Sequence, residues 1–202
     1  HGNVKLVFQP NEEIAGACYM VDEGVLENPH VDASFGVHLW TPIESGKIGL
    51  KSGPVMAEMF NFKINVMGVS CHSSAPQDGV DAILCASNIV QVLQSIPVRE
   101  INPMDTTIIS VCSIHGGSST NIISDKVVLE GSIRYLYDGR DDGMEQPRKR
   151  MERIVNGICA AYRAKAEISF EPSNYILIND EESVAFLKEK VMPEIVPDSE
   201  II

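Results

Sequence analysis

The sequence is poor in positive charge. Of its 202 residues, 16 are Lys or Arg and 28 are Asp or Glu, which gives a formal net charge of -12. Proteins that bind nucleic acids depend on clustered Lys and Arg side chains that contact phosphates. The densest basic run here is the short stretch from Arg148 to Arg150. We therefore expect no nucleic-acid partner.

Long apolar runs are also missing. A membrane-spanning helix needs roughly 20 consecutive apolar residues, and no stretch approaches that length. The opening HGNVKLVFQP lacks the basic segment, apolar core and cleavage site of a secretory leader. We expect a cytoplasmic chain with no membrane partner. The cysteines agree, since they are scattered, lie in apolar surroundings and lack the CxxC spacing of metal and redox sites: Cys18, Cys71, Cys85, Cys112 and Cys159.

Several functional motifs are absent too. The sequence contains no phosphate-binding loop, no Rossmann glycine fingerprint, no GxSxG elbow and no HExxH helix. What remains is 44% hydrophobic and 22% charged, which is typical of a globular protein with a real core. The length predicts one or two domains.

The first 50 residues predict a parallel crossover unit. Val4–Phe8 is an apolar, β-branched run that indicates a buried strand, and Ile14–Gly24 has the spacing of an amphipathic helix. Ala33–Leu39 is a second apolar strand. Strand, helix and strand over this length predict a right-handed unit with a parallel sheet buried on both faces.

Residues 54–172 have a different pattern. Phe60–Met67 alternates as a half-buried strand does, and a helix is expected at about Val80–Ile96. Two strands flank the polar loop Gly116–Ser124, and a helix at about Glu145–Tyr162 precedes a last strand. The order β-α-β-β-α-β predicts a ferredoxin-like α+β domain, a four-stranded antiparallel sheet with two helices on one face.

The remaining segment predicts one more helix, at about Glu181–Val191. We therefore expect residues 54–172 to be inserted into a partial parallel α/β domain made of residues 1–53 and 173–202. The chain opens within four residues of a buried strand and closes on VPDSEII. We interpret it as part of a longer protein.

Three side chains at predicted strand ends are candidates for chemistry. Glu12 and Glu13 follow the first strand and His38 ends the next, and ligands of open α/β sheets bind beyond the carboxyl ends of the strands. One carboxylate can bind a metal while the other holds a water for general-base work. The alternatives stay open, because a helix dipole favours two glutamates at a helix start and a histidine at a strand end is often structural.

The predicted inserted domain supplies three further candidates. His72 lies in the Ser-rich turn GVSCHSSAP, where an imidazole can reach a substrate carbonyl or oxyanion. Asn121 ends the glycine-rich loop, and Arg134 follows on the next strand, where a buried guanidinium would suit a carboxylate. Each also has an ordinary interpretation, as a turn histidine, a loop cap or a surface ion pair. We interpret His30 and His115 as structural.

Four ordered blocks resemble one enzyme family. They are GNVKLVFQPNEE, GVLENPHVDASFGVHLW, GVSCHSSAPQDGVDAI and GGSSTNIISDKVVLEGSIR, and together they span nearly the whole chain. The sequence is similar to the metal-dependent amidohydrolases that include bacterial N-acyl-amino-acid amidohydrolases, hippurate hydrolases, N-acetyl-diaminopimelate deacetylases and plant auxin-conjugate hydrolases. The resemblance implies hydrolysis of the amide bond of an N-acyl amino acid.

The resemblance also implies roles for the candidate residues. The outer domain would be catalytic, with two divalent metal ions, zinc or manganese by expectation; Glu12 would be the general base, and Glu13 and His38 metal ligands. The inserted domain would be a lid that mediates a homodimer. Its side chains would polarise the scissile carbonyl or hold the substrate carboxylate: His72, Asn121 and Arg134.

The sequence departs from the family pattern in two ways. Minor departures are residues that replace a usual alanine, proline or glycine: Asn11, Ser70, Cys71 and Ser124. The larger departure is that no upstream Cys/His motif and no C-terminal metal-binding His are found in these 202 residues. We therefore expect this chain alone to be catalytically inert and to bind divalent metal weakly. The alternatives are a non-catalytic dimerisation or small-molecule-binding protein, and a dipeptidase or aminopeptidase of the same broad group.

Overall fold

The computed structural model describes residues 2–11, 16–136, 146–196 and 201. The chain forms two compact units. Unit 1 comprises residues 1–53 and 179–202, and unit 2 comprises residues 54–178. The strands β1 (Gly53–Met56) and β8 (Leu177–Asn179) pair with each other where the chain passes between the units.

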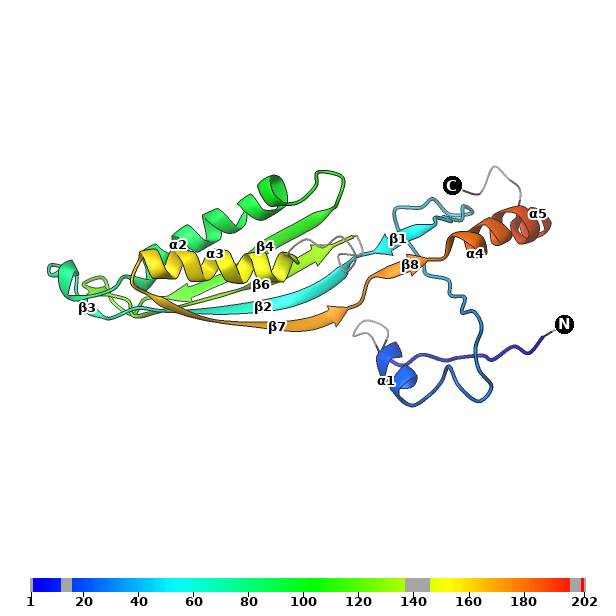
Figure 1. The fold of residues 1–202 in the computed structure, drawn as a ribbon, viewed down its shortest axis with the longest axis horizontal. Coiled ribbons are helices and arrows are strands. Elements are labelled where there is room, and N and C mark those ends of the chain that lie inside the picture. Colours follow the sequence, from blue (N-terminus) through cyan, green and yellow to red (C-terminus); the bar gives the residue numbers. More distant parts are fainter. Residues whose placement is uncertain (1, 12–15, 137–145, 197–200, 202) are drawn as a thin grey trace. The chain divides into compact units, whose positions relative to one another are not determined.

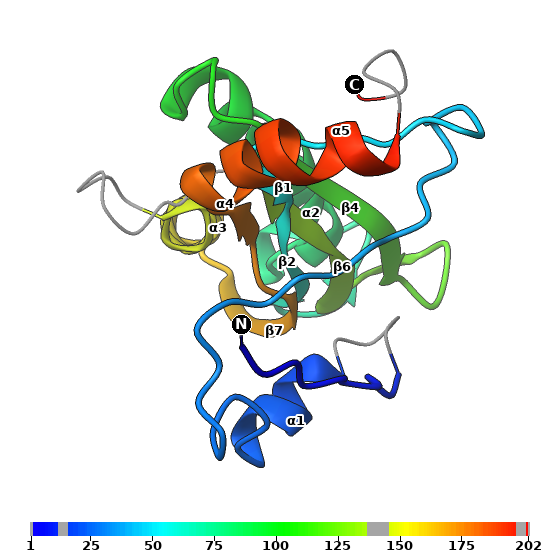
Figure 2. The same cartoon turned by 90° about the vertical axis from the view of Figure 1, so that its right-hand side faces the viewer.

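Unit 2 is a two-layer α/β structure (Figure 1). Its sheet has the order β4-β6-β2-β7, with every neighbouring pair antiparallel. The four strands are β2 (Glu58–Met67), β4 (Thr107–Gly116), β6 (Lys126–Tyr135) and β7 (Lys165–Asn174). The helices α2 (Ala82–Leu93) and α3 (Pro147–Ala161) cover one face, and Figure 2 views α3 end-on. The predicted four-stranded antiparallel sheet with two helices is confirmed.

The shorter elements complete the chain. Unit 2 also contains β3 (Cys71–His72), η2 (Pro76–Asp78), η3 (Ile96–Glu100) and β5 (Ile122–Ile123). Unit 1 contains α1 (Ala17–Asp22), α4 (Glu181–Phe186), η4 (Leu187–Val191) and α5 (Met192–Ile195).

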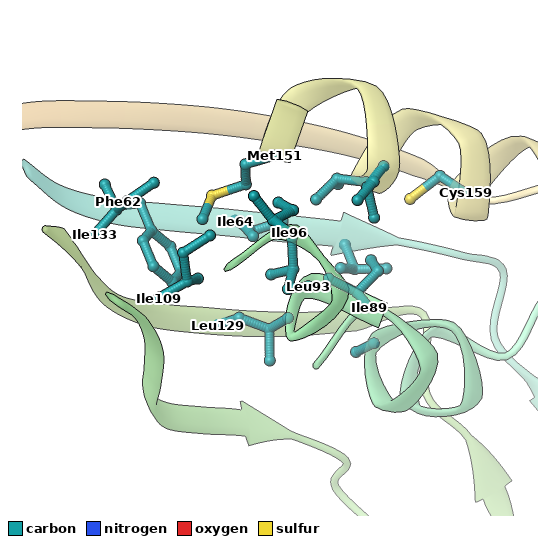
Figure 3. Close-up of a cluster of buried hydrophobic side chains, with 14 of the residues drawn as sticks. Phe62, Ile64, Ile89, Leu93, Ile96, Ile109, Leu129, Ile133, Met151 and Cys159 are labelled. Carbon is teal, nitrogen blue, oxygen red and sulfur yellow. The ribbon is translucent and has the colours of Figure 1, made fainter. Parts of the chain in front are cut away.

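The core of unit 2 follows from sequence periodicity. In β2, alternate residues are buried, and α2 buries a stripe at spacings of three and four. Figure 3 shows these side chains meeting between the helices and the sheet. Fully buried members include Ile64, Ile89, Leu93, Leu129 and Met151. Full burial of one such side chain stabilises the fold by roughly 1.5–3 kcal/mol.

The helix starts carry recognisable signals. The Asp81 carboxylate accepts a hydrogen bond from the Leu84 amide at 2.9 Å and caps α2. Helix α3 begins with Pro147, as the sequence predicts. In unit 1 the Asp180 carboxylate accepts a hydrogen bond from the Ser183 amide at 2.7 Å and caps α4. The hydrogen bonds from Ser183 lower the pKa of Asp180.

Two cysteine thiols meet between the helices of unit 2. The sulfur atoms of Cys85 on α2 and Cys159 on α3 lie 3.8 Å apart, and both residues are buried. Burial and the neighbouring Cys159 raise the pKa of Cys85 to about 12. Because the thiolate is the reactive form, this pair is chemically quiet and serves as packing.

One helical stretch is apolar enough to be compared with a membrane span. Ala82–Glu100 is 19 residues long with a mean hydropathy of 1.2, which meets the length and composition of a spanning helix. Polar residues, among them Ser87, Asn88 and Gln91, interrupt this stretch, so it is not an unbroken apolar run. The core helix of a water-soluble domain passes the same test, and the buried stripe of α2 packs against the sheet. The resemblance of this stretch to a membrane span is therefore weak evidence that it crosses a membrane.

Unit 1 differs from the sequence-based expectation. Residues 4–8 and 33–39 form no strand, so the predicted parallel crossover is wrong for the described part of the chain. Their apolar side chains are exposed, with Val4 at 86% and Leu39 at 91%. A strand is stable only when a neighbour satisfies its backbone hydrogen bonds, and no neighbour pairs with either segment among the described residues. The mixed α/β class itself is confirmed.

The second domain boundary lies later than residue 172. Strand β7 continues to Asn174 and β8 follows, so the division falls after Ile178. The tail of the chain begins its helical part at Glu181, close to the predicted start.

Candidate functional site

The predicted metal ligands are only partly visible. Glu12 and Glu13 lie outside the described residues. His38 is exposed, and its imidazole makes an edge contact with the Trp40 ring at a centroid distance of 6.0 Å. In the part of the chain that the structure describes, no three His, Cys, Asp or Glu side chains come together in a way that could hold a metal ion. The described residues therefore do not fit a metal centre by themselves.

His72 and Asn121 are brought together, although they are 49 positions apart in the sequence (121 minus 72). Strand β3 pairs with β5, with His72 opposite Ile122. The Ser73 amide donates a hydrogen bond to the Asn121 carbonyl oxygen at 2.9 Å. Two loops far apart in the sequence thus form one polar tip at the end of unit 2 where β6 begins.

The hydrogen bonds of His72 favour one tautomer of its neutral ring. The Ser74 amide donates to His72 Nδ1 at 3.3 Å, and the Ser74 hydroxyl lies 2.8 Å from the same atom. Because a backbone N–H can only donate, Nδ1 is the acceptor and the neutral ring carries its proton on Nε2. The exposed Nε2–H is a donor suited to a carbonyl oxygen or an oxyanion.

Asn121 offers a matching donor. The Ser119 hydroxyl donates to Asn121 Oδ1 at 2.6 Å, which occupies the amide oxygen and leaves the amide NH₂ group as the donor. Asn121 is exposed like His72. The tip therefore presents two hydrogen-bond donors without a full positive charge, an arrangement that stabilises developing negative charge on oxygen.

Close backbone contacts hold this tip in place. Val69 and Val80 form an isolated antiparallel bridge, and a side chain on Gly68 would come within 2.1 Å of the Val80 carbonyl oxygen. A side chain on Gly79 would lie 2.4 Å from the Cys71 sulfur. The absent side chain of Gly79 therefore makes room for Cys71, where the family usually has glycine.

Ser124 also has a structural role where the family usually has proline. It is buried, and its hydroxyl donates to the Lys126 carbonyl oxygen at 2.8 Å. The same hydroxyl accepts from the Gly117 amide at 3.3 Å. These bonds close the glycine-rich loop that carries Asn121.

Arg134 lies at the other end of the sheet. It is eight residues along β6 from Lys126 (134 minus 126), which corresponds to roughly 26 Å at the usual strand rise. Its guanidinium is exposed rather than buried, and its register partners are Met59 and Ile108. One copy of unit 2 therefore does not bring Arg134 together with His72 and Asn121.

A polar cavity that the sequence analysis missed lies on the sheet face opposite the helices. It has a volume of about 480 Å³, and its lining includes Lys63, Ser113, Glu130 and Ser132. Lys63 and Glu130 form an ion pair at 2.9 Å, and the hydrogen bond and charge of Lys63 lower the pKa of Glu130. The signal in the sequence is the polar half of the strand alternation, which by itself only indicates a solvated face.

The chain matches a known protein family. Residues 58–163 match the Peptidase dimerisation domain, M20_dimer, which is more than half of the 202 residues. The match covers the strands β2, β4 and β6, both helices and the three predicted substrate-binding residues of unit 2, and it ends before β7.

Curated relatives extend the likeness to most of the chain. An N-acetyl-L-cysteine deacetylase of Bacillus subtilis is 37% identical over 181 residues, 89% of this chain and 42% of that protein. Thermostable carboxypeptidase 2 of Saccharolobus solfataricus is 37% identical over 90% of this chain and 46% of its own length. An N-acyl-L-amino acid amidohydrolase of Geobacillus stearothermophilus is 34% identical over 90% and 48%. The chain thus spans somewhat less than half the length of these relatives.

Solved structures share the fold. A crystal structure from methicillin-resistant Staphylococcus aureus superposes with a TM-score of 0.85 at 28% identity, covering 96% of this chain and 50% of that one. A dinuclear metal-binding peptidase of the M20 family from Bacillus subtilis superposes with a TM-score of 0.74 at 27% identity, covering 96% and 47%.

Replacement of Gly68 tests the packing of the polar tip. We expect Gly68→Ala to lower the free energy of unfolding by about 1–3 kcal/mol, because the new side chain collides with the Val80 backbone. Gly157→Ala is the matched control, since it lies on α3 with nothing within 4 Å and should stabilise by roughly 0.5–1 kcal/mol. Urea unfolding measures both, and similar effects of the two substitutions would contradict the close approach.

Proposed function

Because the chain belongs to the M20 peptidase dimerisation domain family, we propose that the full-length protein containing it hydrolyses the amide bond of an N-acyl amino acid. The supporting observation is the likeness over 89–90% of the chain to a curated deacetylase and an amidohydrolase of N-acyl amino acids. The products would be a carboxylate and a free amino acid.

A peptide substrate is the second candidate. Two relatives are thermostable carboxypeptidases, each 37% identical to the chain. An N-acyl amino acid and a peptide with a free C-terminus share one chemical feature, an amide nitrogen that belongs to an amino acid with a free carboxylate. The exposed guanidinium of Arg134 suits that carboxylate in either case. The two candidates therefore differ only in what lies on the acyl side.

We assign roles to this chain's own residues within that reaction. Glu12 takes a proton from the attacking water as general base, and Glu13 and His38 act as metal ligands. His72 Nε2–H and the Asn121 amide donate to the carbonyl oxygen of the substrate. Two divalent metals, zinc or manganese, are proposed for the full-length protein with further ligands from outside this chain.

We propose that two copies build each active site. Arg134 and the His72–Asn121 tip lie at opposite ends of ten-residue strands, roughly 26 Å apart. A small substrate cannot span that distance within one copy of unit 2. A partner copy that contributes its own tip removes the difficulty, and a homodimer is also what the family name indicates.

The edge strand β4 is the best surface for this dimer. It exposes Ile108 and Ile114, and α2, which contacts β4, exposes Ile83 and Leu84. The opposite edge strand, β7, exposes charged side chains that discourage edge-to-edge pairing, Lys165, Glu167 and Glu171. Antiparallel pairing of two β4 strands across a two-fold axis would join the two sheets.

A cytoplasmic location is also proposed. The five cysteines are all unpaired, which supports a reducing compartment. We propose no nucleic-acid partner, given the net charge of -12, and no membrane partner.

The hydrolysis proposal is tested with the full-length protein, stripped of metal with a chelator and resupplied with zinc or manganese. The substrates are N-acetyl amino acids, N-capped dipeptides and dipeptides with free amino groups. We expect metal-restored release of amino acid from the first group, and we expect Glu12→Gln to lower the rate by about 10²- to 10⁴-fold, since a general base contributes that much. Glu23→Gln, an exposed glutamate of the same unit, is the control and should retain full activity.

Three results would change the assignment. Turnover of capped dipeptides alone would favour the carboxypeptidase candidate. Turnover of free-amine dipeptides alone would favour a dipeptidase or aminopeptidase. A folded, metal-loaded protein that cleaves none of these substrates would favour a non-catalytic binding protein.

The dimer is tested by sedimentation velocity on the 202-residue chain over a concentration series. We expect a dimer that Ile114→Glu converts to a monomer, because the new charge would be buried in the pairing edge. Glu171→Lys on the opposite edge is the control and should stay dimeric. A monomer at every concentration, or dissociation by the β7 variant instead, would contradict the assignment to β4.

A further inference from the structure

A second cavity lies in unit 2 at the end where β2 begins. Its volume is about 320 Å³, and its wall includes Glu58, Phe60, Tyr135, Pro147, Arg148 and Tyr175. Phe60 and Tyr135 belong to the core beneath the helices, so the cavity lies on the helix-covered side of the sheet. Arg134 is on the opposite face, because neighbouring residues of a strand point to opposite sides. The cavity is therefore separate from the proposed substrate-binding residues.

Glu58 is an unusual side chain for such a wall. Only 9% of it is exposed, yet it makes no hydrogen bond and no ion pair with any residue that the structure describes. Its carboxylate oxygens are not among the buried atoms without a partner, so they are open to the cavity. A group that donates hydrogen bonds is the natural complement of this side chain.

Arg148 presents the opposite charge in the same cavity. Its guanidinium carbon lies 4.1 Å from the centre of the Phe60 ring, and its Nη2 has only a long hydrogen bond of 3.4 Å to Gln146 Oε1. Its Nε is buried without an acceptor. Glu58 and Arg148 both line the cavity but do not pair with each other within 4.0 Å. Among the residues that the structure describes, neither charge thus has a counter-charge within 4.0 Å.

A third polar atom at this end of the sheet is also unsatisfied. The register places Thr107, Tyr135 and Glu58 in one row across β4, β6 and β2. Among the described residues, two buried side-chain polar atoms have no partner, Thr107 Oγ1 and Arg148 Nε. Because buried polar groups in proteins are nearly always paired, Arg148 Nε favours a ligand that offers a hydrogen-bond acceptor in the cavity.

We propose that this cavity binds a free α-amino acid with an apolar side chain. Its ammonium group would bind the Glu58 carboxylate and its carboxylate would bind the Arg148 guanidinium. The apolar side chain would contact Tyr175, Tyr135 and Pro147. A simple cation or anion would leave one of the two protein charges unpaired, whereas a zwitterion satisfies both. The volume is at the small end of known ligand sites, which suits a ligand of this size. The site goes beyond the proposed hydrolysis and does not depend on it, because the amino acid is bound and not converted.

Calorimetric titration of the 202-residue chain tests the site with L-phenylalanine and L-leucine as probes, up to roughly 10 mM so that millimolar affinity is detectable. N-acetyl-L-phenylalanine lacks the ammonium charge, and L-phenylalaninamide lacks the carboxylate. We expect saturable binding of at least one of the two free amino acids. If phenylalanine binds, both of its derivatives should bind at least about tenfold more weakly. If only leucine binds, the corresponding leucine derivatives are compared instead. No saturable binding of either amino acid, or equal binding of the derivatives, would overturn the proposal.

Two substitutions test which protein side chain binds the ammonium group of the ligand and which binds its carboxylate. Glu58→Gln should weaken binding of the amino acid and make it bind no more tightly than its N-acetyl derivative. Arg148→Met should make the amino acid bind no more tightly than its amide. Lys149→Met and Glu152→Gln change the same charges at exposed positions of α3 and should leave binding unchanged. If a substitution weakened the binding of all ligands equally, its effect would be structural, and the assignment of that side chain to one charge of the ligand would be overturned. If a variant does not fold, the comparison of the free amino acid with its derivatives on the unaltered chain still tests the proposal. Since the titration measures binding alone, its failure is independent of any failure of hydrolysis.

Discussion

The antiparallel pairing of β2 with β6 is the constraint on which the rest of unit 2 depends. Ten consecutive residue pairs run from Glu58 opposite Tyr135 to Met67 opposite Lys126. A shift of either strand by one residue would turn the apolar side of that strand away from α2 and α3 and would expose Ile64 or Leu129. The core therefore fixes the register, and the register fixes which polar side chains lie at each end of the sheet.

The same register places different polar groups at the two ends of the sheet. At one end, the chain leaves β2 through Gly68 and returns to β6 through Asp125, whose carbonyl oxygen accepts from the Gly68 amide at 2.7 Å. The donors of His72 and Asn121 lie beyond that contact. At the other end lie Arg134 on one face and the Glu58–Arg148 cavity on the other. The ten-residue strands keep these two ends of unit 2 apart, which is the basis of the proposal that each active site takes the two ends from different copies.

Sequence reasoning predicted the sheet and helices of unit 2 because their signals are local. The alternation of Phe60–Met67, the helical spacing of Ala82–Leu93 and the proline at the start of α3 each report on a few neighbouring residues, and the structure confirms all three. The strands expected at residues 4–8 and 33–39 are absent because an apolar run shows that burial is needed and does not supply the partner strand. The cavity at Glu58 and Arg148 was not predicted, since the two residues are 90 positions apart (148 minus 58) and only the packing of α3 against the sheet brings them to one cavity. The sequence likewise did not predict that His72 and Asn121 lie together, although it indicated each of them as a candidate.

Mixing two inactive forms of the full-length protein tests the central claim most directly. One form carries His72→Ala and keeps Glu12, and the other carries Glu12→Gln and keeps His72; both are unfolded or dissociated, mixed in equal amounts and reassembled. If the tip of one copy serves the site of its partner, each mixed dimer gains one intact site, and random pairing restores about a quarter of the wild-type activity. If His72 serves its own copy, every site lacks one of the two groups, and the mixture stays as inactive as its parents. Absence of restored activity in verified mixed dimers would contradict the account.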